Sequence, residues 1–456
     1  MFNQILNSIL ETIGNTPLIK LHHVTKDIKA TVLAKVEFFN PGGSVKDRIA
    51  TLMIDAVEKE GRLKPGGTIV EATSGNTGAG LALIAAVRGY KVIFTMPDKM
   101  SMEKVRHLKG LGADVIVTPT AVPADSPESY YSVAKKIVKE TPNSILANQY
   151  FNPMNPEAHY HSTGPEIWKQ TEGKIDYFVA GIGTGGTITG VGKFLKEKNP
   201  KIKIIGADPV GSILKEFFYT KKMIEAKPYK VEGVGEDIVP GTLNFQYVDE
   251  VITVSDKESF NTARRITREE GIFIGGSGGL AAHAALKLAK NLPKDKIVVT
   301  LLPDSGYKYL STFYSDDWMQ ENRFFDLETI LLKKVLETKS DAIPSLVSVS
   351  MAESVRSALD KMKEFNIAQI PVTENGKSVG SIEEGTIMGR VLADNSLLDG
   401  SVKDVMQKSF PVIDSLNSIE VVKNYLSEKH PAVLIEEAGI IVGIITKFDL
   451  LEFISS

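Results

Sequence analysis

The sequence predicts an α/β protein in which roughly the first 310 residues form a mostly parallel sheet between helices, followed by a smaller domain of different construction. Three observations lead to this fold class. Short apolar runs alternate with helical patterns over the first part, the tail contains an internal repeat, and the net charge changes sign between the two parts. Repeated strand–helix alternation is typical of parallel sheets that helices cover on both faces.

Runs of β-branched and aliphatic residues, each bounded by glycine, proline or polar residues, predict the strands. They are Thr31–Val36, Thr68–Glu71, Lys91–Met96, Val115–Thr118, Tyr177–Gly181, Ile202–Ala207 and Ile297–Leu302. Apolar residues at helical spacing predict helices such as Val45–Glu60 and Gly78–Arg88. Because ligands bind at the carboxyl ends of strands in such sheets, we expect the chemistry at strand-to-helix turns.

The tail differs in charge and in pattern. Residues 341–456 carry 10 basic and 17 acidic side chains, which gives −7 for the tail and +4 for residues 1–340. These opposite net charges could mean that the two domains dock against each other. We favour the simpler interpretation that both are solvent-exposed surfaces with different charge. The sequence of Ala368–Gly380 is similar to that of Pro431–Gly443, 63 residues further along the chain. Each copy has a helical segment before a strand–turn–strand pattern. Two copies predict a pseudo-symmetric pair, since a solenoid needs at least three repeats.

Composition excludes several classes of protein. The 456 residues include 53 basic and 56 acidic side chains, so no overall basic field attracts nucleic acid or anionic membrane. The absence of cysteine excludes a disulfide framework, a thiolate metal site and a cysteine nucleophile. The N-terminus lacks the features of a signal peptide, and the apolar stretch around Ala79–Val87 is too short to span a bilayer. We therefore expect a cytoplasmic protein with no nucleic-acid or membrane partner.

The first unusual turn is Asn40–Arg48, with the sequence Asn-Pro-Gly-Gly-Ser-Val-Lys-Asp-Arg. It places Lys46 on the first turn of a predicted helix, where the helix dipole lowers the pKa of a lysine and favours the free amine. A neutral lysine forms Schiff bases and acts as a general base. Taken alone, the turn is more often a glycine-rich loop with a solvated lysine.

The second turn is Glu71–Gly78, directly after a predicted strand. Its small hydroxyl residues and glycines at a helix N-terminus favour an anion. Because the turn carries no cation, a carboxylate suits it better than a polyphosphate. The alternative is an ordinary N-cap turn, which this density of small polar residues makes less probable.

The third turn is Gly181–Gly190, which follows another predicted strand. Gly181, Gly183 and Gly186 match the dinucleotide-binding pattern, and Asp208 ends the next strand, so an oxidoreductase is a rival interpretation. The threonines among the glycines suit a single terminal phosphate equally well. This motif alone does not decide between the two.

The fourth turn carries a lone serine, Ser305, after the strand Ile297–Leu302. Together the four turns offer a Schiff-base lysine, a carboxylate site, a monophosphate site and a strand-end hydroxyl. Pyridoxal phosphate needs an aldehyde partner, a phosphate site and a partner for its ring nitrogen, and an amino-acid substrate needs a carboxylate site. A nicotinamide enzyme would leave three of the turns unexplained.

These turns resemble the fold-type-II pyridoxal-phosphate enzymes over about the first 320 residues, and most closely the cystathionine β-synthases. Asn40–Arg48 is similar to the lysine motif of that family, Thr73–Gly78 to its substrate loop, Gly183–Thr187 to its phosphate loop and Asp304–Gly306 to the turn with the ring-nitrogen serine. The resemblance implies two subdomains with mostly parallel sheets and pyridoxal phosphate as cofactor. The implied cofactor-binding residues are Lys46, Asn76, Gly183, Thr184, Gly185, Gly186, Thr187 and Ser305.

Further segments are similar to cystathionine β-synthases. They are Met100–Lys104, Asp125–Ser129, Asn148–Tyr150, Asn155–Tyr160 and Tyr314–Met319. The resemblance implies a β-replacement that condenses L-serine with L-homocysteine, in which Lys46 moves the Cα proton. The neutral Ser305 hydroxyl would leave the ring nitrogen unprotonated, and Asn76 would bond the 3′-oxygen of the cofactor. The implied substrate-binding residues are Thr73, Ser74, Gly75, Thr77, Gln149 and Tyr150.

The tail resembles the paired CBS regulatory modules. The predicted domains are therefore 1–322 (catalytic), 323–343 (linker) and 344–456 (regulatory). Thr446 and Asp449 are similar to the nucleotide-ribose motif of such modules. The ligand stays open between S-adenosylmethionine, another adenine nucleotide and none. The first copy has Glu383 and Thr386 at the matching positions, so at most one ribose site is expected to be intact.

Two departures from the family stand out. The catalytic pattern starts near Gly14, which leaves no room for the N-terminal haem-binding extension of animal members, and the chain has no cysteine to ligate haem. Glu236 stands where animal members have tyrosine, which bears on the second substrate. His159 and His161 lie two apart without further ligands, and we expect no metal site.

The resemblance also implies a homodimer or a higher homo-oligomer. Two other functions stay open. One is a cysteine synthase that uses O-acetylserine and sulfide, and the other is a nucleotide-sensing binding protein with a vestigial enzyme domain.

Overall fold

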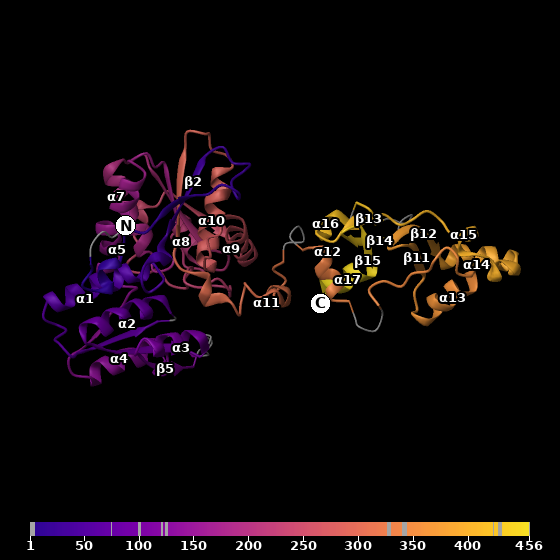
Figure 1. The fold of residues 1–456 in the computed structure, drawn as a ribbon. Helices are drawn as coiled ribbons and strands as arrows, with labels where there is room; N and C mark the ends of the chain where they lie inside the picture. Colours follow the sequence, from indigo (N-terminus) through magenta and orange to yellow (C-terminus); the bar gives the residue numbers. More distant parts are fainter. Residues whose placement is uncertain are drawn as a thin grey trace. The chain divides into compact units, whose positions relative to one another are not determined.

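The computed structural model describes residues 5–73, 75–98, 102–119, 122–123, 126–325, 330–339, 344–422, 424–426 and 431–455. The chain divides into two compact units, Met1–Phe324 and Phe325–Ser456 (Figure 1). The first unit holds a six-stranded and a four-stranded sheet, and the second holds two smaller sheets. This confirms the predicted α/β fold class. Of the helices in the described ranges, none is long and apolar enough to cross a membrane.

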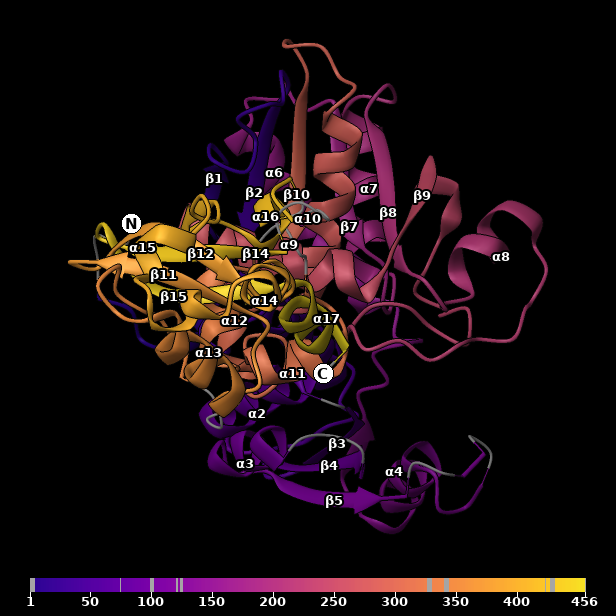
Figure 2. The same ribbon diagram turned by 90° about the vertical axis from the view of Figure 1, so that its right-hand side faces the viewer.

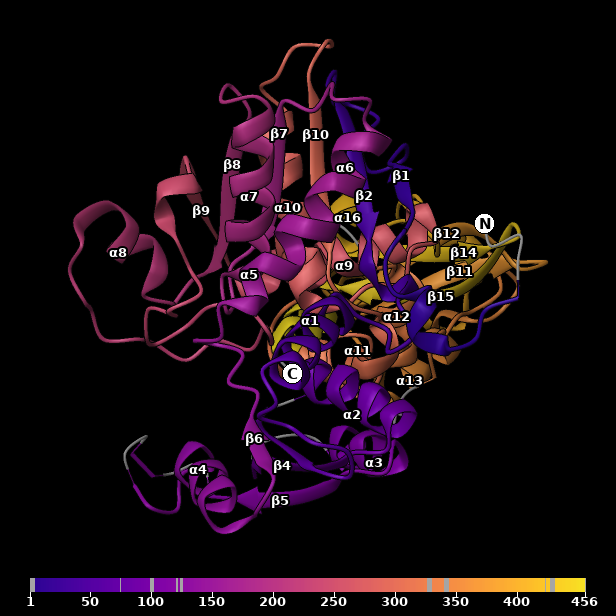
Figure 3. The ribbon, with the colours of Figure 1, turned by 90° about the vertical axis from the view of Figure 1, so that its left-hand side faces the viewer.

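The six-stranded sheet has the order β1-β2-β10-β7-β8-β9, and all neighbouring pairs are parallel except β1 with β2. Its strands are β1 (Leu18–Lys20), β2 (Thr31–Val36), β7 (Tyr177–Gly181), β8 (Lys203–Pro209), β9 (Glu250–Val254) and β10 (Ile297–Leu302). Figure 3 shows α6 (Gly164–Gln170) and α7 (Gly186–Lys198) on one face of this sheet. Figure 2 shows α9 (Asp256–Glu270) and α10 (Gly276–Ala289) on the other face. Because both faces are covered, the central strands β7 and β10 are largely buried.

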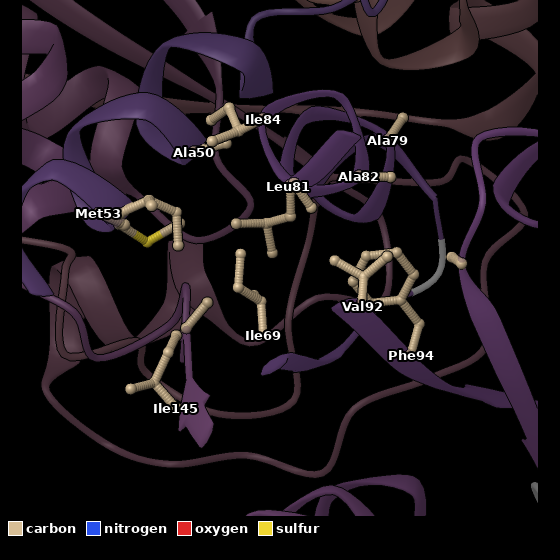
Figure 4. Packing of buried hydrophobic residues seen from close by; sticks show 14 of the residues in the cluster. Ala50, Met53, Ile69, Ala79, Leu81, Ala82, Ile84, Val92, Phe94 and Ile145 are labelled. Atoms are coloured by element: carbon tan, nitrogen blue, oxygen red, sulfur yellow. The ribbon is translucent and has the colours of Figure 1, made fainter. Parts of the chain in front are cut away.

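The four-stranded sheet has the order β5-β4-β3-β6 and is parallel throughout. Its strands are β3 (Thr68–Ala72), β4 (Lys91–Pro97), β5 (Asp114–Thr118) and β6 (Ser144–Leu146). Successive residues of β3 point to opposite faces, as the pleat requires. Ile69 packs with α1 (Lys46–Lys59) and α2 (Asn76–Arg88), in the core that Figure 4 shows, whereas Val70 packs with α4 (Tyr130–Glu140).

The predicted strands all lie where the structure has strands, with ends that agree within two residues. Within the first unit, no strand was predicted at β1, β6 or β9. β1 and β6 are three residues long, which is too short for a periodic signal. β9 has the sequence Glu-Val-Ile-Thr-Val and the composition of a strand, so its omission was an error of interpretation.

The second unit contains the predicted repeat. Its elements are α12 (Leu332–Glu337), α13 (Val355–Glu364), β11 (Gln369–Glu374), β12 (Lys377–Glu383), α14 (Glu384–Ala393), α15 (Val402–Val405), β13 (Val412–Asp414), α16 (Ile419–Val422), β14 (Ala432–Glu437), β15 (Ile440–Thr446) and α17 (Lys447–Ser455). The two hairpins turn at Asn375–Gly376 and at Ala438–Gly439, where all four residues have positive φ. Both hairpins also shift register at equivalent places, after Val372 and after Ile435. The internal repeat is therefore confirmed.

Candidate active site

Lys46 is the first residue of α1 and lies beside the turn that follows β10. Ser44 forms a short antiparallel bridge with Asp304, which joins the two turns. Burial lowers the pKa of Lys46, while the negative charges of Asp304 and Glu236 oppose this shift. The sequence predicted a lowered pKa from the helix dipole, and the structure adds burial as a cause.

The glycine-rich loop between β7 and α7 lines the same pocket as Lys46. The loop residues at this pocket are Gly181, Gly183, Thr184, Gly185 and Thr187. A Cβ at Gly183 would lie 2.5 Å from the carbonyl oxygen of Gly233, and Gly185 has a φ of +80°. Glycine is therefore required, and backbone N–H groups at the start of α7 are left close to the pocket. Such a helix start with threonine hydroxyls suits a phosphate, so the pocket fits a group with an aldehyde near Lys46 and a phosphate at the loop.

A short helix, α5 (Met154–Ala158), supports the phosphate loop from behind. Nδ2 of Asn155 donates to Oγ1 of Thr184 (3.0 Å) and to the carbonyl oxygen of Gln149 (2.8 Å). A Cβ at Gly186 would lie 1.9 Å from Oδ1 of Asn155, so only glycine lets the helix approach. The sequence analysis missed this role of Asn155.

Asn76 is the first residue of α2, directly after the substrate loop. Its Nδ2 donates to Oδ2 of Asp304 (2.9 Å), and Nζ of Lys308 donates to its Oδ1. Oγ1 of Thr73 accepts two backbone N–H groups of the loop, each at 3.3 Å. The predicted residue Ser74 lies outside the described residues. The structure thus brings the substrate loop and the turn after β10 together.

Gln149 reaches the same loop from the turn after β6, and Tyr150 follows it in the chain. Oγ1 of Thr77 donates to Oε1 of Gln149 (2.6 Å). The carboxylate of the buried Glu71 accepts the N–H groups of Asn148 (2.6 Å) and Gln149 (3.1 Å). Burial raises the pKa of Glu71 to about 7, and these two bonds oppose the shift. Glu71 therefore positions the turn, a role that the sequence analysis missed.

Ser305 and Asp304 follow β10 but face different surroundings. The Ser305 hydroxyl accepts the N–H of Tyr307 (3.4 Å), and Ser305 borders a second, more apolar pocket that includes Phe273. Asp304 is fully buried and accepts the hydroxyl of Tyr309 (2.8 Å). Its Oδ1 has no hydrogen-bond partner among the described residues. The structure brings Asp304, rather than Ser305, into contact with the other predicted turns.

Glu236 adds a carboxyl group to the electrostatics of the site. Its N–H donates to Oγ of Ser212 (3.0 Å), and its carbonyl oxygen accepts the N–H of Ile213 (3.1 Å), which fixes the backbone. Burial raises the pKa of Glu236 to about 8, while the Tyr150 hydroxyl and the charge of Lys46 oppose the rise. Glu236 therefore takes up a proton more readily than an exposed glutamate does.

The predicted regulatory residues lie together in the second unit. Oδ2 of Asp449 accepts both the N–H and the hydroxyl of Thr446, each at 2.6 Å. Its Oδ1 lies 2.9 Å from Nζ of Lys339, and Lys339 also donates to the carbonyl oxygen of Ile444 (2.8 Å). The sequence analysis missed Lys339. Over the ranges that the structure describes, no group of three or more histidine, cysteine or acidic residues could hold a metal ion.

Family models match both parts of the chain. Residues 9–304 match the family described as pyridoxal-phosphate dependent enzyme, and residues 340–393 and 402–456 each match the CBS domain. The chain is 41% identical to a cystathionine beta-synthase of Dictyostelium discoideum, over 99% of this chain and 92% of that protein. It is 42% identical to one of Apis mellifera, over 100% and 92%. For one of Saccharomyces cerevisiae the identity is 38%, over 98% of both chains.

Solved structures agree with this family. The crystal structure of an O-ureido-L-serine synthase is similar with a TM-score of 0.64 and 36% identity, over 69% of this chain and 98% of that one. A hydrogen sulfide-producing enzyme from Fusobacterium nucleatum is similar with a TM-score of 0.63 and 37% identity, over 67% and 98%. The chain therefore belongs to the cystathionine beta-synthase family of pyridoxal-phosphate dependent enzymes, with a C-terminal pair of CBS domains.

Proposed function

We propose that this enzyme condenses L-serine with L-homocysteine to give L-cystathionine and water. The observation that carries the proposal is the pocket shared by Lys46 and the loop Gly183–Thr187, in a chain similar to cystathionine beta-synthases over its whole length. In this proposal residues 1–322 form the catalytic domain, 323–343 the linker and 344–456 the regulatory pair.

Bound pyridoxal phosphate supplies an electron-withdrawing ring that stabilises the charge left when an amino acid loses its Cα proton. Lys46 acts as the base, because burial favours its neutral amine, and it accepts the Cα proton of serine. The Cβ–O bond of serine breaks and the C–S bond to homocysteine forms; the thiol gives up its proton, and in net this proton converts the leaving hydroxyl to water. Lys46 then returns a proton to Cα.

The other site residues bind and orient. Gly183, Thr184, Gly185, Gly186 and Thr187 hold the phosphate, supported by Asn155 behind them. By the family resemblance, Asn76 is assigned to the 3′-oxygen of the cofactor and Ser305 to its ring nitrogen, although Ser305 borders the neighbouring apolar pocket in this structure. The substrate carboxylate is held by the loop and turn that the Thr77–Gln149 hydrogen bond joins. These carboxylate-binding residues are Thr73, Ser74, Gly75, Thr77 and Gln149, and Tyr150 is a further substrate-binding residue.

Turnover with two substrate pairs tests the reaction. We expect faster turnover with serine plus homocysteine than with O-acetylserine plus sulfide, measured as kcat/KM for each pair on the full-length protein. Faster sulfide chemistry would instead make the chain a cysteine synthase. This alternative deserves the direct comparison because one similar solved structure is a hydrogen sulfide-producing enzyme.

We also propose that Thr446 and Asp449 bind the ribose of an adenine nucleotide or of S-adenosylmethionine. A ribose hydroxyl would compete with Lys339 for Oδ1 of Asp449. We therefore expect Lys339→Met to bind adenosine, used as an uncharged probe, about 3- to 5-fold more tightly than the wild type in calorimetry. Asp449→Asn is the control and should abolish binding. Weaker binding by Lys339→Met would contradict competition and assign Lys339 to ligand binding.

The catalytic unit is proposed to form a homodimer or a higher homo-oligomer. The apolar pocket beside Ser305 is lined in part by exposed aromatic side chains, with Phe39 and Tyr307 exposed by 59% and 75%. Exposed apolar patches of this kind mark protein interfaces. We further propose that the enzyme is cytoplasmic and haem-free, since it has no cysteine to serve as a thiolate ligand.

A further inference from the structure

A buried histidine lies directly behind the phosphate loop. His159 is 1% exposed, and its ring stands between two threonines. Nε2 lies 3.2 Å from Oγ1 of Thr187, and Nδ1 lies 2.9 Å from Oγ1 of Thr163. A π-helical turn, His159–Thr163, continues α5 at this point, and such turns are frequent at functional sites.

The imidazole is neutral in this position. Burial lowers the pKa of His159 well below its usual value, and the charge of Arg48 lowers it further. A neutral ring carries one N–H, so one nitrogen donates and the other accepts. Both nitrogens have a hydroxyl partner, and a hydroxyl can play either role. Two arrangements of the Thr163–His159–Thr187 chain are therefore possible.

Only one arrangement leaves Thr187 able to donate to an anion. If the Thr163 hydroxyl donates to Nδ1, then Nε2–H donates to Oγ1 of Thr187, and the Thr187 hydrogen is free to turn toward the pocket. In the opposite arrangement Thr187 donates to Nε2, and its lone pairs are left for the pocket. An anion in the pocket would oppose those lone pairs and favour the first arrangement.

We propose that His159 is a positioning residue for the cofactor phosphate, held as the Nε2–H tautomer so that the Thr187 hydroxyl donates to a phosphate oxygen. The inference rests on the proposed phosphate role of Thr187. Neither nitrogen touches the phosphate, because His159 acts through Thr187. His159, which the sequence suggested only as one half of a rejected metal-binding pair with His161, thus belongs to the cofactor site.

Titration of the full-length apoenzyme with pyridoxal phosphate, and with pyridoxal, which lacks the phosphate, tests this role. We expect His159→Leu to weaken pyridoxal phosphate binding about 10- to 100-fold and to leave pyridoxal binding unchanged. His159→Gln keeps an N–H near the Nε2 position and should bind within about threefold of the wild type. A purely structural role would weaken both ligands alike and would not be rescued by glutamine.

Thr187→Val should show the same loss as His159→Leu, and the double variant should show no further loss, since both remove one donor. His283→Leu is the matched control, because Nδ1 of His283 also lies 3.0 Å from a threonine hydroxyl, that of Thr262. It should bind both ligands normally.

Two results would overturn the inference: wild-type affinity of His159→Leu for pyridoxal phosphate, or equal losses for both ligands. Unchanged affinity of Thr187→Val would instead refute the proposed role of Thr187. If His159→Leu does not fold, Thr163→Val, which removes the donor to Nδ1, should show a smaller loss that is again confined to pyridoxal phosphate. If Thr163→Val bound pyridoxal phosphate as tightly as the wild type, this would contradict the Nε2–H tautomer of His159.

Discussion

Replacing Lys46 with alanine is expected to lower turnover by at least about 10³-fold and to remove the visible absorption of bound pyridoxal phosphate. Lys46 is the lysine that shares a pocket with the phosphate loop, and burial favours its neutral amine. The variant should keep the wild-type circular dichroism spectrum, because no ion pair or hydrogen bond of the described residues involves its ammonium group. Assay and absorption spectrum on the same sample measure both effects.

Lys104 is the matched control, because burial lowers its pKa too, to about 8. A lowered pKa alone would make it an equal candidate, yet it pairs with Glu232 and does not line the pocket of the phosphate loop. Lys104→Ala should therefore keep the absorption. Borohydride reduction followed by peptide mapping should find the cofactor on Lys46. A colourless wild-type protein that does not bind pyridoxal phosphate, or a label on Lys104, would refute the assignment.

Replacing Arg48 with methionine is expected to destabilise the catalytic unit by about 3–5 kcal/mol, because it leaves buried carboxylates without their partner. Nε of Arg48 lies 2.7 Å from Glu37, which is fully buried, and Nη1 lies 2.7 Å from Glu166. Lys35 pairs with the other oxygen of Glu166 at 2.7 Å. This network links α1, β2 and α6 beside the active-site lysine.

Urea unfolding followed by tryptophan fluorescence measures the loss, because both tryptophans, Trp168 and Trp318, belong to the first unit. Arg88→Met is the control: Arg88 pairs with Asp55 and Glu58 on the surface and should cost less than about 1 kcal/mol. A similar small cost for Arg48→Met would contradict the importance of the buried network.

The same network predicts acid sensitivity. Burial alone would raise the pKa of Glu166, but the hydrogen bonds and charges of Arg48 and Lys35 hold it at about 2. A lowered pKa stabilises the folded state above the unfolded pKa, near 4.5, and this contribution is lost as the pH falls toward 2. We therefore expect the wild type to lose about 3 kcal/mol over this range, and Arg48→Met to lose much less.

Much of the site could be predicted from the sequence because its chemistry lies in short motifs. The loop Gly183–Thr187 needs glycine where no Cβ fits or where φ is positive, and such requirements leave a local signal. Lys46 was found for the same reason, since it follows two glycines at a helix start. Strands such as β7 and β10 were found because glycine, proline or polar residues bound them.

The residues that hold these motifs in place could not be predicted in this way. Asp304 bonds Asn76 across 228 positions, and Lys339 bonds Ile444 across 105. These contacts arise when distant strands and helices assemble, and no local pattern marks them. His159 lies 28 positions from Thr187, and its spacing from His161 pointed only to a rejected metal site.

The π-helical turn His159–Thr163 makes the arrangement of the site depend on the number of residues in this helix. One residue fewer would restore a regular α-helix and rotate the following residues by about 100° relative to those before it. Gly164 would then lose its close approach to α7, and Glu166 would turn away from Arg48. Insertions and deletions are therefore constrained here even where single substitutions are tolerated. In related sequences this segment should stay free of alignment gaps, and residue identity should vary only at positions other than His159 and Thr163.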